Sequence, residues 1–232
     1  MLSIQFIIKR LIDLIIALLL LVPAVLFSIV VGILIKMDSK GPALFMQRRL
    51  GKNNRIFTMY KFRTMHNDAS EKRKELESKN EANGFLFKMG LDPRETSFGR
   101  KLRSTGLDEL PQIINVLKGE MSLIGPRPLP VEDVDLDKLK QNPNLYHEWQ
   151  IRKSVKPGIT GLWQVSQSNH SFSEMLKLDE YYVEKYSIWK DIKIIAMTLR
   201  LMMRGLTSLF CVKKRNLNGN KQNNIKVEVV KE

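Results

Sequence analysis

Residues 11–35 read LIDLIIALLLLVPAVLFSIVVGILI, and all but four of these 25 residues are Ala, Val, Ile, Leu or Phe. A straight helix of this length extends about 37 Å, whereas the hydrocarbon core of a bilayer is about 30 Å thick. The run is too long for the apolar part of a cleaved signal peptide, which spans about 7–15 residues. The sequence therefore predicts that this segment inserts into a membrane.

The charges beside this run argue against a simple crossing. Basic residues flank it on both sides, namely Lys9, Arg10, Lys36, Lys40, Arg48 and Arg49. A single span would leave some of them on the non-cytoplasmic side. Pro23 divides the run into residues 11–22 and 24–35, and each half would form a helix of about 18 Å, enough for one leaflet. We predict a re-entrant helical hairpin with its break at Pro23; a proline-kinked single span is the alternative.

The composition of the 232-residue chain excludes several classes of protein. Apolar residues make up 44% and charged residues 27%, values that fit neither a disordered chain nor a polytopic membrane protein. The single cysteine, Cys211, cannot form an internal disulfide, and with three histidines it leaves too few ligands for a structural zinc site. The net charge of +14 favours a phosphate-bearing ligand, whether nucleic acid, lipid or nucleotide.

A β-hairpin is predicted directly after the apolar run. Residues 44–50 and 55–64 flank the turn sequence GKNN at positions 51–54. The two-residue period of the second strand places Lys61 and Arg63 on the same face, together with Phe57 and Met59. Lys61 and Arg63 are therefore candidates to bind one anion together; a charged, solvated strand edge is the alternative.

The sequence RKLRSTGLDELPQ at residues 100–112 is the best candidate for chemistry. Pro111 is tolerated only in the first turn of a helix, so the helix should begin near Leu107 or Asp108 and end at Lys118-Gly119. Its apolar stripe would comprise Leu110, Ile113, Ile114 and Leu117. Asp108 and Glu109 then lie at a helix N-terminus, which favours carboxylates and phosphates alike. Simple helix capping is the alternative.

Arginines near these acids suggest phosphoryl transfer. Arg103 lies five residues before Asp108, and Arg127 is held between Pro126 and Pro128. A preorganised guanidinium is suited to two phosphate oxygens. Aspartate can attack phosphorus, and cations or Mg²⁺ offset the charge repulsion.

A second amphipathic segment is predicted near the C-terminus. Its apolar stripe comprises Ile192, Ile195, Ala196, Leu199, Met202, Met203 and Leu206. Its cationic face comprises Lys193, Arg200 and Arg204. Such a helix suits the interface of an anionic leaflet, and a helix that packs its stripe on the protein core is the equal alternative.

Four ordered motifs resemble the bacterial sugar transferase family, the monotopic phosphoglycosyl transferases. They are KFRTM at 61–65, LDELPQ at 107–112, NVLKGEMSLIGPRP at 115–128 and KPGITGLWQV at 156–165. The resemblance implies transfer of a sugar-1-phosphate from a UDP-sugar to polyprenyl (undecaprenyl) phosphate, with release of UMP, as a first membrane step of polysaccharide or glycan assembly. It implies that Asp108 forms a covalent phosphosugar intermediate, that Glu109 assists and that Mg²⁺ binds at Asp108. Arg103 and Arg127 would hold phosphate groups.

The same resemblance implies an α+β architecture at the bacterial inner membrane. Residues 1–37 would form the membrane-inserted helix-break-helix, and residues 38–210 the mostly helical catalytic domain on the cytoplasmic face. Independently of the resemblance, the Asn- and Lys-rich composition without periodicity predicts that residues 211–232 form a basic, disordered tail. The domain would contain the small β-hairpin and interfacial amphipathic helices, as in the minimal form of the family, and could form a homo-oligomer. At 167–169 the sequence QSN replaces a Gly-Arg pair frequent in the family.

Two other functions compete with this interpretation. Asp133, Asp135 and Asp137 spell two overlapping D-x-D patterns, as in metal-dependent glycosyltransferases. Prolines precede them and no apolar strand delivers them, so a solvated acidic loop is expected. A membrane-tethered nucleic-acid-binding protein would use aromatic residues among cations, such as Phe57, Tyr60 and Phe62. It leaves Asp108, Glu109 and Arg127 unexplained, so no nucleic-acid partner is expected.

Overall fold

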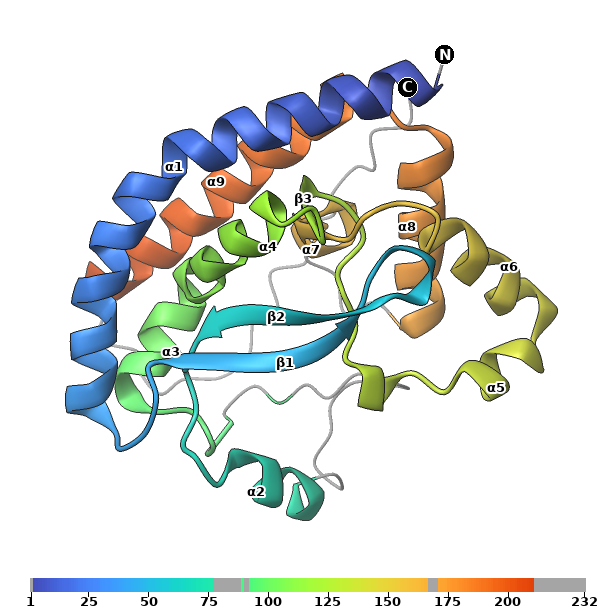
Figure 1. Cartoon of the computed structure of the whole chain (residues 1–232). Helices are drawn as coiled ribbons and strands as arrows, with labels where there is room; N and C mark the ends of the chain where they lie inside the picture. Colours follow the sequence, from blue (N-terminus) through green and yellow to red (C-terminus); the bar gives the residue numbers. More distant parts are fainter. Residues whose placement is uncertain (1, 77–88, 90–91, 167–170, 211–232) are drawn as a thin grey trace, which may run out of the picture.

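The computed structural model describes residues 2–76, 89, 92–166 and 171–210 (Figure 1). Its helices and strands are α1 (Leu2–Asp38), β1 (Leu44–Leu50), β2 (Ile56–Phe62), α2 (Ala69–Glu75), α3 (Ser97–Ser104), α4 (Ile113–Leu117), β3 (Ser122–Ile124), α5 (Leu136–Lys140), α6 (Pro143–Arg152), β4 (Gly158–Thr160), α7 (Leu162–Val165), α8 (Phe172–Glu184) and α9 (Ile188–Phe210). The described part is therefore mostly helical with two two-stranded sheets, which confirms the α+β prediction. The loop at 167–169 and the tail at 211–232, for which predictions were made, lie outside the described residues.

Helix α1 is continuous across Pro23, so the predicted break into two helices is wrong. A bend takes its place, and α1 curves around the rest of the domain (Figure 1). Pro23 lacks a backbone donor, and one turn later the Ser28 hydroxyl donates a 2.6 Å hydrogen bond to the carbonyl of Ala24. Both features bend a helix without ending it.

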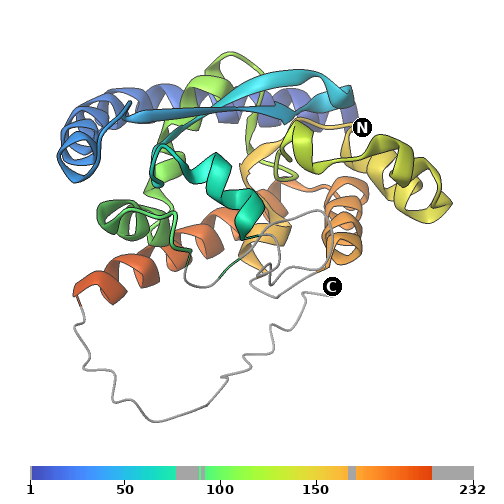
Figure 2. The same cartoon turned by 90° about the horizontal axis from the view of Figure 1, so that it is seen from below.

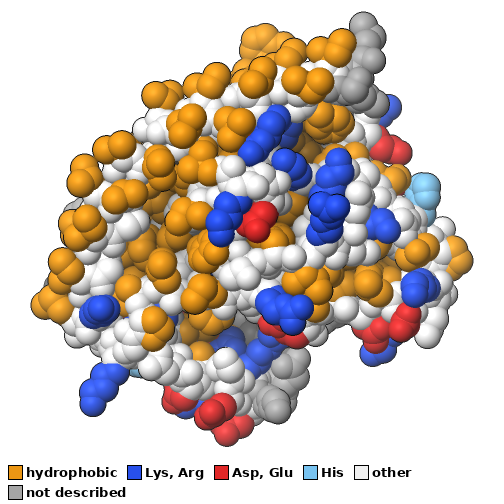
Figure 3. Space-filling model, viewed as in Figure 1, with side chains coloured by type: hydrophobic (Ala, Val, Ile, Leu, Met, Phe, Trp, Pro, Cys, Tyr) orange, Lys and Arg blue, Asp and Glu red, His pale blue; other side chains and the backbone are white. Residues whose placement is uncertain are grey.

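The convex side of α1 is an apolar surface. Among the described residues, α1 is the one helix that is long and apolar enough to cross a membrane. Its exposed apolar side chains include Ile4, Ile7, Leu11, Ile15, Leu19, Val22, Leu26, Ile29 and Ile33, and apolar side chains follow the rim of the molecule in Figure 3. An exposed apolar surface of this extent indicates contact with a membrane.

The predicted β-hairpin is confirmed. Strands β1 and β2 pair antiparallel from Leu44 with Phe62 to Leu50 with Ile56. Asn53 and Asn54 in the turn have φ angles of 54° and 58°, a left-handed region that asparagine tolerates better than most residues.

The buried face of the hairpin packs on α1 and α4. Phe57 and Met59 of β2 form one hydrophobic cluster with Ala17 of α1 and with Ile113 and Val116 of α4. Lys61, which continues the same face of β2, therefore points toward the region where α4 begins.

The motif KPGITG forms a close crossing with the motif GPRP. Strand β4 pairs parallel with β3, with Ser122 opposite Gly158 and Ile124 opposite Thr160. A Cβ atom on Gly158 would lie 2.1 Å from the backbone nitrogen of Gly125. A side chain at Gly158 would thus separate the two strands and displace the turn that leads to Arg127.

Helix α9 and the β1–β2 hairpin lie on opposite sides of the molecule (Figure 2).

The predicted apolar stripe of α9 is divided between two environments. Ile195 and Met202 are half-buried, whereas Ile192, Leu199, Met203 and Leu206 are exposed. One side of α9 thus packs on the core, as one alternative predicted, and the other side leaves apolar groups beside the exposed Lys193, Arg200 and Arg204. Contact of this exposed side with a membrane stays a prediction.

Candidate active site

A cleft of about 610 Å³ lies between the helix α1, the helix α9 and the segment that precedes α4. One part of its lining is charged and comprises Lys61, Arg103, Asp108, Glu109 and Arg127. The other part is apolar and comprises Ile16 and Leu20 of α1 with Ile195, Leu199, Leu201 and Met202 of α9. The structure therefore brings together five of the six charged side chains that the sequence nominated, and places them beside the two helices with exposed apolar faces.

Asp108 is positioned by a tight turn before α4. Gly106 has a φ of 72°, and a 3₁₀ helix then runs over Leu107–Gln112 with Pro111 inside it. The predicted start near Leu107 is confirmed, as is the end, where Lys118 is the C-cap and Gly119 has a φ of 81°. The α-helix itself begins only at Ile113, because Pro111 has no N–H and its ring disfavours a preceding α-turn.

This change of helix type alters which side chains are buried. Ile114, predicted on the buried stripe, is 42% exposed, whereas Asn115 is fully buried. The Asn115 amide nitrogen donates to the carbonyl of Thr58 at 2.7 Å, and the Asn115 amide oxygen accepts from the backbone nitrogen of Tyr60 at 3.2 Å. Asn115 thus joins the segment that carries Asp108 to the strand that carries Lys61.

The Asp108 carboxyl is buried, with 5% exposure. Burial raises the pKa of Asp108 to about 6, with a further contribution from Glu109 and opposing contributions from Lys61 and Arg103. Burial also lowers the pKa of Lys61 to about 8, although Asp108 acts against this change. At pH 7, Asp108 is therefore mostly an anion and Lys61 mostly a cation, in a site shielded from water.

Arg127 forms an ion pair with Glu109 in the lining of the cleft. The Arg127 guanidinium lies 2.9 Å from a Glu109 carboxylate oxygen, and this acid raises the pKa of Arg127. The proline-flanked turn is held by two further arginines: Arg152 donates to the carbonyl of Arg127, and Arg49 donates to the carbonyl of Pro128 at 2.8 Å. No local sequence pattern signals these roles of Arg49 and Arg152, because the two residues lie 79 and 25 positions from the carbonyls that they contact.

Arg103 lies at the more exposed edge of the cleft. Its guanidinium is 3.2 Å from Glu95, which also lies 3.3 Å from the guanidinium of Arg100. Two arginines share one carboxylate, so Arg103 retains positive charge that can face the cleft.

The prediction that Arg63 binds an anion together with Lys61 is wrong. Strand β2 ends at Phe62, so the alternation of faces does not extend to Arg63. The buried Arg63 guanidinium donates to the carbonyls of Ser39, at 2.8 Å, and Lys40, and to the side-chain oxygen of Asn67 at 2.9 Å. It closes the C-terminal end of α1 instead of lining the cleft.

The two D-x-D patterns do not form a site in the described part of the chain. Asp133 lies 2.6 Å from the guanidinium of Arg73, Asp135 caps the N-terminus of α5, and Asp137 pairs with Lys140 at 2.9 Å. No group of three or more His, Cys, Asp or Glu side chains that could hold a metal occurs among the described residues.

The aromatic residues invoked for nucleic-acid binding are mainly core residues. Phe57 and Phe62 are 8% and 1% exposed. Bases stack on accessible aromatic faces, so this arrangement gives no support to a nucleic-acid-binding surface on β2.

The comparisons with known proteins agree with these features. The profile of the family described as bacterial sugar transferase matches residues 4–205. The galactosyl transferase CpsE of Streptococcus agalactiae serotype III (strain NEM316) is 48% identical over 168 residues, which cover 71% of this chain and 35% of the relative. The undecaprenyl-phosphate galactose phosphotransferase of Salmonella typhimurium (strain LT2) is 37% identical over 201 residues, covering 84% of this chain and 40% of the relative.

A third relative has a similar length to this chain. The uncharacterized sugar transferase EpsL of Bacillus subtilis (strain 168) is 37% identical over 202 residues, covering 85% of this chain and 88% of EpsL. This chain thus spans less than half of the first two relatives and most of the third. The extent of the profile match and these identities show that the chain belongs to the bacterial sugar transferase family.

Proposed function

We propose that the chain transfers a sugar-1-phosphate from a UDP-sugar to undecaprenyl phosphate at the cytoplasmic face of the bacterial inner membrane, and releases UMP. The observation that carries this proposal is the position of Asp108. It is a buried carboxylate between the cations of the cleft and an apolar wall formed by α1 and α9. Such a cleft suits one substrate with a charged diphosphate and another with a long apolar chain. Several relatives are named as undecaprenyl-phosphate sugar phosphotransferases.

The reaction consists of two displacements at one phosphorus. A carboxylate oxygen of Asp108 attacks the phosphorus that carries the sugar, the bond to the bridging oxygen breaks, and UMP leaves with the electron pair. An oxygen of the lipid phosphate then attacks the same phosphorus and releases the Asp108 carboxylate. Lys61, Arg103 and Arg127 balance the negative charge of the phosphates in both steps.

Asp108 and Glu109 would hold Mg²⁺. Mg²⁺ is commonly bound by one or two carboxylates together with substrate phosphates, and two adjacent carboxylates in the cleft fit that pattern. One Glu109 oxygen is engaged by Arg127, which leaves the other available. When bound, Mg²⁺ supplies positive charge that offsets the repulsion between the Asp108 carboxylate and the phosphates.

We also propose that α1 enters the membrane and returns, so that both its ends are cytoplasmic. Contacts at both ends support this topology. Near the N-terminal end, Lys9 lies 2.7 Å from Asp191 of α9, and Arg10 donates to the carbonyl of Val116 at 2.8 Å. At the C-terminal end, Asp38 accepts from the backbone nitrogen of Phe98 at 3.1 Å. A helix attached at both ends to one polar domain cannot have these ends on different sides of a bilayer.

The activity is tested with detergent-purified chain, a panel of UDP-sugars, undecaprenyl phosphate and Mg²⁺. We expect UMP as the nucleotide product, no turnover for Asp108→Asn, and near-normal turnover for Asp137→Asn, which changes an exposed carboxylate outside the cleft. Release of UDP, or a stronger effect of Asp137→Asn than of Asp108→Asn, would sink the proposal. Mass spectrometry of enzyme mixed with donor alone should detect the phosphosugar on the peptide that contains Asp108.

A further inference from the structure

A second cavity, of about 180 Å³, lies where α1 meets the tip of the β1–β2 hairpin. Its charged lining comprises Lys9, Arg10 and Asp13 of α1, Lys52 in the hairpin turn and Lys156 before β4. Of the residues that the structure describes, Ile124 alone lines both this cavity and the cleft that contains Asp108. We name it the basic cavity; none of its charged residues takes part in the reaction proposed above.

The acid that lines the basic cavity is already engaged. The Asp13 carboxylate accepts hydrogen bonds from the Ser122 hydroxyl at 2.7 Å and from the backbone nitrogen of Leu123 at 3.1 Å. Lys9 is neutralised by Asp191 at 2.7 Å. These two donors are neutral, so Asp13 keeps its single negative charge; the remaining cations Arg10, Lys52 and Lys156 outnumber it, and the cavity keeps an excess of positive charge.

Arg10 is fixed in place without being neutralised. Its guanidinium donates to the carbonyls of Val116, at 2.8 Å, and Leu117, at 3.4 Å. These acceptors carry no net charge, so the positive charge of Arg10 is not cancelled, and a guanidinium has five N–H donors to share.

The side-chain ammonium groups of Lys52 and Lys156 have no hydrogen-bond or ion-pair partner among the residues that the structure describes. A Cβ atom on Gly119 would lie 3.6 Å from the Lys156 ammonium nitrogen and 3.5 Å from an Arg10 guanidinium nitrogen, so these two cations share one neighbourhood. Burial lowers the pKa of Lys156 and the positive charge of Arg10 lowers it further, while the Asp13 carboxylate acts against this change and Lys52 adds to it. Like charges held together in this way favour an anionic ligand.

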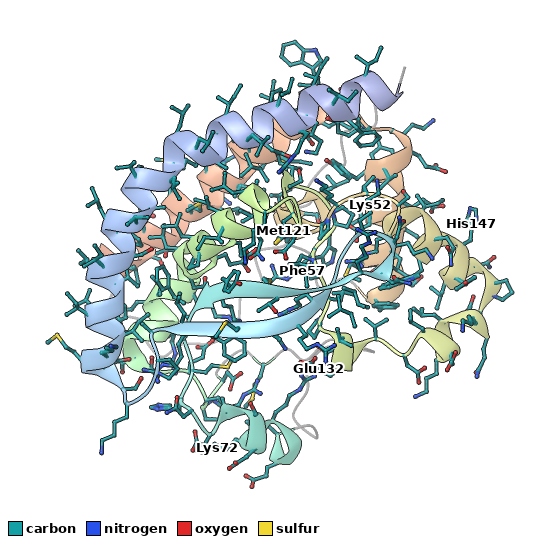
Figure 4. All side chains as sticks on the ribbon, viewed as in Figure 1. Lys52, Phe57, Lys72, Met121, Glu132 and His147 are labelled. Carbon is teal, nitrogen blue, oxygen red and sulfur yellow. The ribbon has the colours of Figure 1, made fainter. Side chains whose placement is uncertain are left out.

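The basic cavity lies at the level where α1 meets lipid. Ile7 and Leu11 are 62% and 55% exposed and lie within one turn of Arg10. Figure 3 shows Lys and Arg side chains between the apolar rim of α1 and the hairpin tip, where Figure 4 labels Lys52. An anion that reaches these cations next to the exposed apolar side chains would have its charge at the surface of the bilayer and its apolar part beside α1.

We propose that the basic cavity binds the phosphate of an anionic phospholipid headgroup, held by Arg10, Lys52 and Lys156. Its ligand is a structural lipid, and the site is separate from the cleft in which the reaction takes place. The bound lipid would link the hairpin tip to α1, since Lys52 lies in the hairpin turn and Arg10 lies on α1. The same turn is also held by a 2.8 Å hydrogen bond from the backbone nitrogen of Asn53 to the carbonyl of Lys153.

Native mass spectrometry of the full chain in detergent tests this site, with dioleoylphosphatidylglycerol, dioleoylphosphatidylcholine and inorganic phosphate as probes. We expect preferential binding of phosphatidylglycerol. Lys52→Ala/Lys156→Ala should weaken that binding at least about tenfold, since charge-assisted contacts to phosphate are among the strong ones. The matched control Lys138→Ala/Lys140→Ala removes the same charge from exposed positions of α5 and should weaken binding less than about threefold.

Three results would overturn the proposal. Equal losses in both double variants would indicate general attraction between charges and no site. Equal binding of phosphatidylcholine would exclude charge recognition. Displacement of the lipid by millimolar inorganic phosphate, with the same dependence on Lys52 and Lys156, would assign the cavity to a soluble phosphate. Lys52→Arg/Lys156→Arg should retain binding, and circular dichroism should confirm that all variants are folded.

Discussion

At the scale of single residues, the proposed chemistry depends on the Asp108 carboxylate, whose buried surroundings disfavour its charged form. The pKa of Asp108 is raised to about 6, chiefly by burial and then by Glu109. Its ionised form is therefore less well solvated than in water, which makes it a better nucleophile toward phosphorus. The same environment makes two measurable properties of the protein depend on pH.

The first property that should depend on pH is the rate of the proposed reaction. We expect kcat/KM for the UDP-sugar to fall about tenfold per pH unit below about pH 6, because protonation removes the nucleophile. In Lys61→Met this acid limb should move to higher pH, since the Lys61 charge favours the Asp108 carboxylate. The measurement is a pH–rate profile at fixed Mg²⁺ for both proteins. A limb that stays in place or moves to lower pH in Lys61→Met would contradict this pairing of charges.

The second is stability. A carboxyl with a raised pKa in the folded state destabilises the fold as pH rises above the unfolded value near 4. This penalty is complete above the folded pKa of about 6 and absent below pH 4. Asp108→Asn removes the charge, so it should stabilise the protein by about 1–3 kcal/mol at pH 8 and have little effect at pH 4. Thermal unfolding without Mg²⁺ measures this difference. The inactive variant should melt higher than wild type at pH 8, and a lower melting temperature would argue against a raised pKa.

At the scale of elements, the attachment of α1 to the domain depends on capping. The buried Arg63 guanidinium donates to the carbonyls of Ser39 and Lys40 at the end of α1. Sequence alternation suggested a substrate contact for this residue, whereas its position makes it structural.

Arg63→Ala should therefore lower the free energy of unfolding by about 2–4 kcal/mol, because it removes a buried side chain and leaves two partly buried carbonyls without their donor. Arg63→Lys, which keeps a cation that can reach these carbonyls, should recover part of the loss and leave the KM for the UDP-sugar unchanged. Arg55→Ala, at an exposed position of the hairpin, serves as the control and should change stability by less than about 0.5 kcal/mol. If Arg63→Ala instead raises the KM for the UDP-sugar without loss of stability, the sequence-based prediction that Arg63 contacts the substrate would be supported.

The sequence predicted those elements whose limits are local. The turn GKNN set the hairpin, and Pro111 together with Gly119 set the limits of the segment around α4, because turn and cap preferences act over a few residues. The errors arose where distant parts of the chain decide. Packing against residues far away in sequence decides whether Pro23 ends or bends α1. It also decides where the Arg63 side chain points. The contacts of Arg49 and Arg152 with the turn that contains Arg127 were not predicted for the same reason, because they also join residues far apart in sequence.

At the scale of the whole molecule, the proposed topology predicts that both ends of the bent α1 lie on the same side of the membrane. Cysteine labelling tests this topology in a Cys211→Ser background. We expect a membrane-impermeant thiol reagent to leave both Ser3→Cys and Lys40→Cys unmodified in intact spheroplasts and to modify both after lysis, since both ends of α1 should be cytoplasmic. Modification of one of the two before lysis would establish a full crossing and remove the re-entrant topology from the proposal.

The contacts of Arg10 and Asp13 give α1 a second role. Arg10 donates to the last carbonyls of α4, and Asp13 accepts from residues of β3, so this apolar helix completes the hydrogen bonding of elements that pack next to the segment carrying Asp108. It is consequently not a detachable tether. A water-soluble fragment obtained by deleting it would lose the framework of its own reaction centre, and a foreign anchor grafted in its place would restore attachment to the bilayer without restoring turnover.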